Sequence, residues 1–377
     1  MRQLTIPLAV VALIACGNTA PTTMSSTTGV GGAIDTSTHH GLGGSDGGTG
    51  RQDGGGGRGG SGGHGGHGGS KGDAGHESDA ALTDGASDDG PSDDGPSDGA
   101  DSGATSPDGG LVLPSPLDGV TTDDISNLSE IVAALDALPH KPTTRIVFDE
   151  GEQPAYYAQA VPAIHAVSYV MGELLDSEYV TTVSVAGYTQ RTADYLAAFP
   201  TGVDLWEVGN EINGNWLGAT ADVVAKMTGA FDLVKAAGGH TELTLYGCSD
   251  SGASYDMFNW TTANIPARML TGLDYVLVSY YDGDCGVPRA ASEWPAVFEQ
   301  LHQLFPNAGV GFGEVGSVDQ NGNDLGTTSV AGPIVQQYYG LKINVPSYVG
   351  GYFWWYFDED MVPKTKPLFA TLSAAMQ

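Results

Sequence analysis

Hydrophobic positions recur with a regular period only beyond about residue 110. From there, runs of β-branched and aromatic residues alternate with stretches whose apolar residues are three or four positions apart, the pattern of an amphipathic helix. Strands are predicted at 145–148, 180–186, 203–208, 243–246, 275–280, 310–315 and 348–357. Helices are predicted at 123–138, 154–175, 189–199, 220–237, 255–270, 292–305, 329–341 and 368–376.

This series begins with a helix, so an eighth strand is expected before it. The best candidate is the short apolar run 111–113 or its neighbours. Eight strand–helix units in about 250 residues define the (β/α)8 TIM barrel. An open doubly wound sheet is the alternative, but it needs a glycine-rich phosphate turn, which follows none of the predicted strands. We therefore predict an α/β fold with a TIM barrel spanning 111–377.

The first 110 residues have a different composition. They hold 31 of the 57 glycines of the 377-residue chain and none of its aromatic residues. Such a segment cannot bury enough apolar surface to offset the entropy that it would lose on ordering. We therefore predict a disordered Gly/Ser/Asp-rich linker over 17–110, which would hold the folded domain at a distance from its anchor.

Residues 1–16 are typical of an export signal. A basic start is followed by an apolar run that is too short to span a bilayer as a mature helix. The run ends in Leu-Ile-Ala-Cys-Gly, which resembles the bacterial lipobox, whose cysteine (here Cys16) becomes lipidated. A cleaved secretory signal with a chance cysteine is the alternative. Because Gly17 rather than Asp follows, we expect an exported protein that is lipid-anchored to the bacterial outer membrane or cell surface.

The net charge of −31 limits the partners of the chain. Acidic side chains outnumber basic ones by 14 to 4 over residues 1–110 and by 31 to 10 beyond them. Phosphate backbones repel such a protein, so nucleic-acid binding is not expected. The chain has no polybasic stretch to hold an anionic membrane, which leaves the lipid anchor as its membrane contact. An acidic domain with many aromatic residues is compatible with a neutral ligand such as a sugar.

Two glutamates stand at the ends of predicted strands. Glu211 follows the fourth strand of the predicted barrel, and Glu314 ends the seventh. In a TIM barrel both ends lie on the face built by the βα loops, where catalytic side chains gather. Two carboxylates that face each other across this mouth can cleave a glycosidic bond, because one protonates the leaving oxygen and the other attacks the anomeric carbon.

These positions resemble the clan A glycoside hydrolases, a group of retaining TIM-barrel enzymes. In that group an Asn-Glu pair ends the fourth strand and supplies the acid/base, and a nucleophilic Glu ends the seventh strand. The segment Trp-Glu-Val-Gly-Asn-Glu at 206–211 and the Gly-Glu pair ending at Glu314 match, and the resemblance covers roughly residues 110–377. It implies that Glu211 is the acid/base, that Glu314 is the nucleophile and that Asn210 donates to the sugar 2-hydroxyl.

The resemblance also implies aromatic contacts with the sugar and the nucleophile. A tyrosine after the sixth strand binds the nucleophile in this group; Tyr281 fits, and Tyr280 is the alternative. A tryptophan on the eighth strand forms a sugar platform. Trp355 is preferred to Trp354, because neighbours on one strand cannot both face inward. Trp216, just beyond the acid/base, is a further platform candidate.

Other residues have structural interpretations or depart from the group's pattern. Glu207 is interpreted as a buried structural carboxylate. Arg145 begins the second predicted strand, whereas clan members carry an Arg towards that strand's end, so a structural ion pair is at least as good an interpretation. Several families place a His at the ends of the third and sixth strands, where Tyr188 and Ser279 stand here.

The two remaining cysteines follow neighbouring strands. Cys248 comes after the fifth predicted strand and Cys285 after the sixth, which places both loops on the same rim of the barrel. An exported compartment permits disulfides, and lipidation of Cys16 leaves an even pair. We therefore expect a disulfide between Cys248 and Cys285.

These features together favour a retaining glycoside hydrolase that cleaves a β-linked polysaccharide by double displacement with two Glu. Its expected partner is a polysaccharide or oligosaccharide substrate, and we expect a monomer with no cofactor and no metal site. The alternative is a catalytically inactive carbohydrate-binding surface lipoprotein that uses the same cleft.

Overall fold

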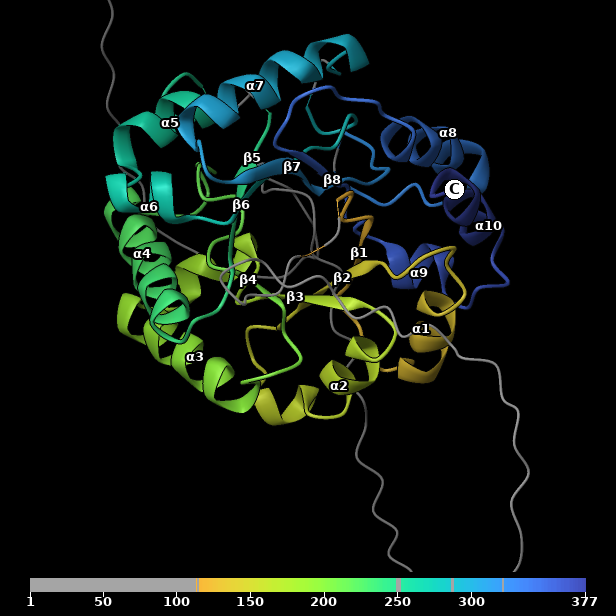
Figure 1. Ribbon diagram of the computed structural model, residues 1–377, viewed down its shortest axis with the longest axis horizontal. Coiled ribbons are helices and arrows are strands. Elements are labelled where there is room, and N and C mark those ends of the chain that lie inside the picture. The colour runs from red at the N-terminus through yellow and green to blue at the C-terminus, as the bar shows by residue number, and fades with distance from the viewer. Residues whose placement is uncertain (1–112, 114, 249–251, 286–287, 321) are drawn as a thin grey trace, which may run out of the picture. The chain divides into compact units, whose positions relative to one another are not determined.

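The strands lie in one parallel sheet, in which each strand pairs with the next along the chain. The computed structural model describes residues 113, 115–248, 252–285, 288–320 and 322–377 (Figure 1). The predicted signal with Cys16 and the predicted linker 17–110 lie outside the described residues. The strands are β1 (Gly119–Thr122), β2 (Thr143–Val147), β3 (Tyr169–Glu173), β4 (Leu205–Glu207), β5 (Thr241–Tyr246), β6 (Tyr275–Ser279), β7 (Gly309–Glu314) and β8 (Tyr348–Gly351).

The sheet closes on itself. The amide of Leu117 donates to the carbonyl of Val349 at 2.7 Å, and the amide of Thr121 donates to that of Trp354 at 2.9 Å. A parallel bridge also joins Val120 to Trp354, just beyond β8. Eight parallel strands in this order, with helices between them, form the predicted (β/α)8 TIM barrel, and the fold prediction is confirmed.

Helices surround the sheet on its outside (Figure 1). They are α1 (Leu128–Leu135), α2 (Ala160–His165), α3 (Val185–Ala198), α4 (Thr220–Ala236), α5 (Met257–Asn264), α6 (Ala267–Gly272), α7 (Trp294–Leu304), α8 (Thr328–Tyr339), α9 (Phe357–Met361) and α10 (Pro367–Ala375), with 3-10 turns η1 (Pro154–Tyr157), η2 (Ser177–Thr182) and η3 (Ala291–Glu293). Helix α4 illustrates the pattern, since it buries Val223, Met227, Ala230 and Val234, which share one face. Among the described residues, none of the helices combines the length and apolar character that a membrane crossing requires.

The first strand lies elsewhere than predicted. Leu113 is buried but belongs to no strand, residues 111 and 112 are outside the described part, and β1 begins only at Gly119. The sequence of β1 is Gly-Val-Thr-Thr, which has a single large apolar side chain, yet Thr121 and Thr122 are fully buried. A Cβ at Gly119 would lie 2.5 Å from the ring of Phe353, so close packing rather than strand propensity selects this residue.

The hydrophobic periodicity also predicts the third strand at the wrong residues. The predicted helix 154–175 contains η1 and α2 and ends in β3, whereas the predicted strand 180–186 lies in η2 and the start of α3. Strand β3 carries Gly172 and the buried Glu173, which conceal it from a hydrophobic pattern. Tyr188 therefore lies in α3 and not at a strand end, and its hydroxyl donates to the carbonyl of Val208 at 3.2 Å. The other six strands overlap their predicted ranges.

Candidate active site

Glu211 and Glu314 lie at the carboxyl ends of their strands, on the same face of the barrel. Glu314 is the last residue of β7, and Glu211 stands four residues after the end of β4. Both are buried, with 6% and 3% of their surface exposed. The structure therefore brings the two glutamates together as predicted.

One hydroxyl joins the two carboxylates. The Oγ of Ser279 lies 2.6 Å from Oε1 of Glu211 and 3.2 Å from Oε2 of Glu314. These two carboxylate oxygens are therefore within about 6 Å of each other, close to the roughly 5–5.5 Å between the carboxyl groups of retaining glycosidases.

A strained turn aims Glu211 into the barrel mouth. Its backbone has a φ of +46°, in the left-handed region that non-glycine residues seldom adopt. The amide of Gly214 donates to the Glu211 carbonyl at 2.8 Å, and the amide of Ile212 donates to that of Thr244 at 3.3 Å. These bonds hold the turn against its strain, and such strain is concentrated at functional sites in proteins.

The surroundings of Glu211 favour its neutral form. Burial raises the pKa of its carboxyl well above the ordinary value, and the nearby charge of Glu314 raises it further. The hydroxyl of Ser177 lies 2.9 Å from Oε2 of Glu211. A carboxyl group that keeps its proton near neutral pH is able to act as a general acid.

Glu314 instead lies among donors. The guanidinium of Arg145 and the amide of Asn210 each donate to its Oε1 at 2.7 Å. The hydroxyl of Tyr281 donates to its Oε2 at 2.9 Å. Hydrogen bonds from cationic and neutral donors favour an ionised carboxylate, so this glutamate is suited to nucleophilic attack.

Arg145 is central to the charge balance of the site. It is fully buried and contacts Glu207 at 2.7 Å, Glu314 at 2.7 Å and Glu173 at 2.9 Å. Burial disfavours its charge, but the three carboxylates outweigh burial and raise its pKa well above the ordinary value. The structural ion pair weighed from sequence is present with Glu207, and the same guanidinium also contacts the proposed nucleophile.

The barrel interior holds more carboxylates than cations. Glu173, Glu207 and Glu242 are all at most 1% exposed, and Arg145 is the cation that the structure places in contact with the first two. Burial raises the pKa of each of these three carboxyls. Glu207, interpreted from sequence as a buried structural carboxylate, also accepts from the amide of Asn210 at 3.0 Å and so helps to orient that side chain.

We expect Glu242→Gln to stabilise the protein at neutral and alkaline pH. The pKa of Glu242 is raised well above 4.5 in the folded state by burial, so ionising it costs folding free energy as the pH rises above about 4.5. The penalty grows by at most about 1.4 kcal/mol per pH unit, and Gln avoids it while still accepting from the Thr244 hydroxyl, 3.1 Å away.

Urea unfolding of the wild type, Glu242→Gln and the exposed control Glu299→Gln at pH 5 and pH 8 measures this effect. The free energy of unfolding of Glu242→Gln should exceed that of the wild type more at pH 8 than at pH 5. An equal difference at both pH values would contradict the buried-charge explanation.

The preferred tyrosine, Tyr281, is the one that reaches Glu314. Tyr281 is 1% exposed and contacts Glu314, whereas the hydroxyl of Tyr280 accepts from the amide of Arg289 at 2.6 Å and its ring packs on Trp294. Burial raises the pKa of Tyr281 well above its ordinary value, so its hydroxyl stays a donor.

Trp354 and Trp355 lie beyond the end of β8 and not on it as predicted, and their surroundings differ. Arg145 lies over the ring of Trp355 at 5.1 Å, which places this ring towards the site, and Trp355 is 5% exposed. Trp354 is fully buried, and its Nε1 donates to Asp360 at 2.9 Å. Trp216 is partly exposed, and its Nε1 donates at 3.3 Å to the hydroxyl of Ser177, which contacts Glu211. Trp355 thus lies beside Arg145, which contacts Glu314, and Trp216 lies beside Ser177, which contacts Glu211.

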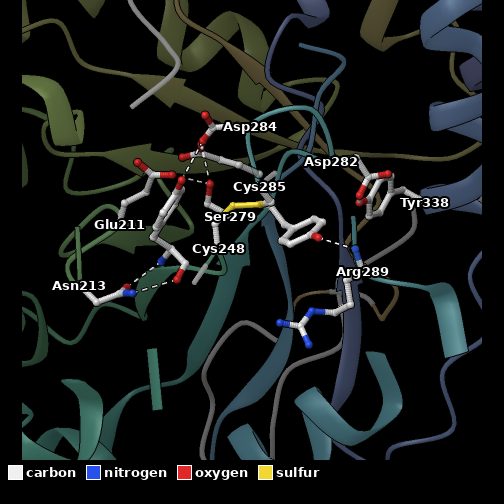
Figure 2. The surroundings of a disulfide bond; sticks show 12 residues. Glu211, Asn213, Cys248, Ser279, Asp282, Asp284, Cys285, Arg289 and Tyr338 are labelled. Atoms are coloured by element: carbon white, nitrogen blue, oxygen red, sulfur yellow. Dashed lines mark hydrogen bonds between the residues drawn. A yellow bond between two sulfur atoms is a disulfide. The ribbon is translucent and has the colours of Figure 1, made fainter. Parts of the chain in front are cut away.

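A disulfide joins Cys248 and Cys285, in the loops after β5 and β6, with their Cα atoms 5.1 Å apart. Figure 2 shows it beside Ser279 and Glu211. Asp284 accepts from the Tyr246 hydroxyl at 2.8 Å and ties the same loops together. The cross-link therefore restrains the loop that also carries Tyr281.

One acidic cluster offers oxygen ligands outside this site. Carboxylate oxygens of Asp123, Asp358 and Glu359 lie within 4.8 Å of one another, after β1 and in α9. Burial raises the pKa of all three and takes that of Glu359 to about 8. Protons are therefore able to relieve the repulsion in this cluster near neutral pH without a metal ion.

Ser177 and the role of Ser279 were not identified from sequence. Ser177 begins η2, directly after the strand β3 that the periodicity places elsewhere, so no sequence pattern predicts its position in the site. Ser279 stands where other families carry a His, and its position two residues before Tyr281 is the signal that the sequence offers. Arg145 was weighed, but its contact with Glu314 depends on the length of the side chain and the closure of the barrel.

No protein-family model and no curated protein matches this chain. Among solved structures, an FMN-binding β-glucuronidase from Faecalibacterium prausnitzii is similar at 12% identity, with a TM-score of 0.49, over 72% of this chain and 46% of that one. A glycoside hydrolase family 5 enzyme from Prevotella bryantii, solved with a xyloglucan oligosaccharide, is 14% identical over 70% and 93%, with a TM-score of 0.48.

A β-mannanase from Thermomonospora fusca is 18% identical over 64% of this chain and 78% of that one, with a TM-score of 0.43. The chain spans less than half the length of the glucuronidase. Identities and TM-scores this low say nothing of the activity of this protein, which follows from its own site.

Proposed function

We propose that this protein is a retaining glycoside hydrolase that cleaves a β-linked polysaccharide by double displacement. The observation that carries the proposal is the pair of buried carboxyl groups, Glu211 and Glu314, whose oxygens contact one hydroxyl at 2.6 and 3.2 Å. The surroundings of Glu211 favour its protonated form and those of Glu314 favour its ionised form, which is the combination that double displacement needs.

In the first step Glu314 attacks the anomeric carbon while Glu211 gives its proton to the leaving glycosidic oxygen. The carbon–oxygen bond to the leaving group breaks, and an ester to Glu314 forms. The Asn210 amide donates to Glu314 at 2.7 Å, and when a sugar is bound this N–H turns to donate to the sugar 2-hydroxyl. In the second step Glu211 takes a proton from water, the water oxygen attacks the anomeric carbon, and the ester to Glu314 breaks.

The surroundings of the pair suit a neutral sugar. The ring faces of Trp355 and Trp216 are apolar platforms for the carbon–hydrogen faces of a pyranose, and polar groups between them reach the hydroxyls. The first 16 residues and the composition of 17–110 support a place for the enzyme outside the cell, lipid-anchored through Cys16, where polysaccharides are accessible.

A reducing-sugar assay of the full chain against β-mannans, β-glucans, xylans and galactans tests the proposal. We expect reducing ends to be released from at least one of these neutral polymers. Binding of a glycan without any release, measured by affinity electrophoresis on the same polymers, would favour the inactive carbohydrate-binding protein instead. Neither release nor binding would overturn both.

A further inference from the structure

Ser279 lies between the two carboxyl groups, and the role given to it here rests on the proposed function. Ser279 is fully buried at the end of β6. The pairing of β6 with β7 shifts there, because Val278 lies opposite Phe312 and Ser279 lies opposite Glu314, so that Gly313 is passed over. Such bulges re-aim side chains beside active sites, and this one turns the hydroxyl towards both glutamates.

A serine hydroxyl has one proton and two lone pairs. It therefore cannot donate to Glu211 and Glu314 at the same time, although its oxygen is within hydrogen-bond distance of both. Both contacts are hydrogen bonds at the same time only when one carboxyl group is protonated and its O–H donates a hydrogen bond to the serine oxygen. The other carboxyl group, ionised, then accepts the serine proton.

The remaining contacts fix the direction of this chain. Arg145, Asn210 and Tyr281 already favour the ionised form of Glu314. On the other side, the Trp216 indole donates to Ser177, which leaves the Ser177 proton for Oε2 of Glu211. The proton of Glu211 therefore belongs on Oε1, which faces Ser279.

We propose that Ser279 is a positioning residue that keeps the proton on Glu211 and the charge on Glu314 by accepting from the first and donating to the second. After Glu211 has given its proton to the leaving group and Glu314 has become an ester, the hydroxyl turns and donates to the Glu211 carboxylate. Ser279 keeps its own proton throughout, and only the direction of its O–H bond changes.

This arrangement makes opposite predictions for the two serines that touch Glu211. Two carboxyl groups that share one hydroxyl titrate as a coupled pair, in a lower and an upper step. Loss of the Ser279 hydroxyl removes a donor from the Glu314 anion and an acceptor from the Glu211 proton. The lower step should rise and the upper step should fall, by roughly half a unit to one unit each.

Loss of the Ser177 hydroxyl should act the other way on the upper step. Ser177 only donates to Glu211, so its removal disfavours the Glu211 anion and raises the upper step, without moving the lower one. Other ionisable groups around the pair stay the same in both variants: Arg145, Glu173, Asp176, Glu207, Glu242 and Tyr281. Their fields therefore cancel in the comparison.

The test is an NMR titration of the full chain labelled with 13C at the glutamate carboxyl carbons, assigned with Glu211→Gln and Glu314→Gln. Ser279→Ala, Ser177→Ala and the exposed control Ser292→Ala are titrated beside the wild type, and the pH profile of kcat/KM is recorded for each. We expect the two steps to converge in Ser279→Ala, the upper step to rise in Ser177→Ala, and no shift in Ser292→Ala. If Ser279→Ala does not fold, Ser279→Cys, which fills the space with a weaker donor, should shift the steps in the same directions.

An upper step that rises in Ser279→Ala as it does in Ser177→Ala would make Ser279 a plain donor to Glu211 and overturn the inference. Unchanged steps would also overturn it. The proposed function fails separately: converging steps in a protein that hydrolyses no glycan would leave the serine's role intact and remove the hydrolase. If the protein hydrolyses a glycan but the two titration steps do not converge in Ser279→Ala, the proposed function stands and the role of Ser279 is wrong.

Discussion

Glu314→Gln should lower kcat by about 10⁴-fold or more while glycan binding is retained. The amide has nearly the shape of the carboxylate but cannot attack the anomeric carbon, so no ester intermediate forms. Its oxygen can still accept from Arg145, and its nitrogen, in the place of Oε2, can donate to the Tyr281 hydroxyl, so the packing of the site is preserved. Steady-state turnover on the best polymer of the panel, with binding measured by calorimetry, gives both quantities.

The matched control is Glu299→Gln, which makes the same change on the exposed face of α7. It should keep wild-type turnover. If Glu314→Gln also kept it, Glu314 would not be the nucleophile. If binding disappeared together with turnover while the fold stayed intact, the carboxylate would be needed for binding, and the separation of the two roles would be wrong.

Glu211→Ala should show an effect that depends on the leaving group. Removing a general acid costs about 10²–10⁴-fold for a poor leaving group, which needs its proton. A dinitrophenyl glycoside needs no protonation, so its first step should stay close to the wild-type rate and the ester on Glu314 should accumulate. Azide, which attacks without a general base, should then restore turnover and give a glycosyl azide of retained configuration.

These rates are measured as the burst of dinitrophenolate and the steady state with and without azide. An equal loss for good and poor leaving groups would contradict an acid/base role for Glu211. A glycosyl azide of inverted configuration would show that no ester on the enzyme precedes the azide.

Much of the fold could be predicted from the sequence because most strands carry contiguous apolar residues between well-separated helices. Strands β1 and β3 could not, since polar or small residues interrupt their apolar pattern and are buried by closure of the barrel. Thr121 and Glu173 illustrate this, because both are fully buried without belonging to an apolar run. Tertiary packing, which no local pattern contains, decides such positions.

The same division holds for the site. Glu211 and Glu314 could be found because the ends of parallel strands meet on one face, whatever the loops do. The choice of Tyr281 over Tyr280 followed from the group's pattern, and the structure places that hydroxyl on Glu314. Ser177 and the double contact of Ser279 depend on a loop turn and on a bulge, so they required the coordinates.

During turnover Glu314 is expected to form a covalent bond with the sugar while Glu211 lies opposite it. Reaction of the full chain with a 2-deoxy-2-fluoro glycoside bearing a good leaving group, followed by mass spectrometry of the peptides, tests it most directly. We expect one fluorosugar per chain, attached to the side chain of Glu314. If the protein hydrolyses the parent glycoside but carries the label on another residue, or carries none, Glu314 is not the nucleophile.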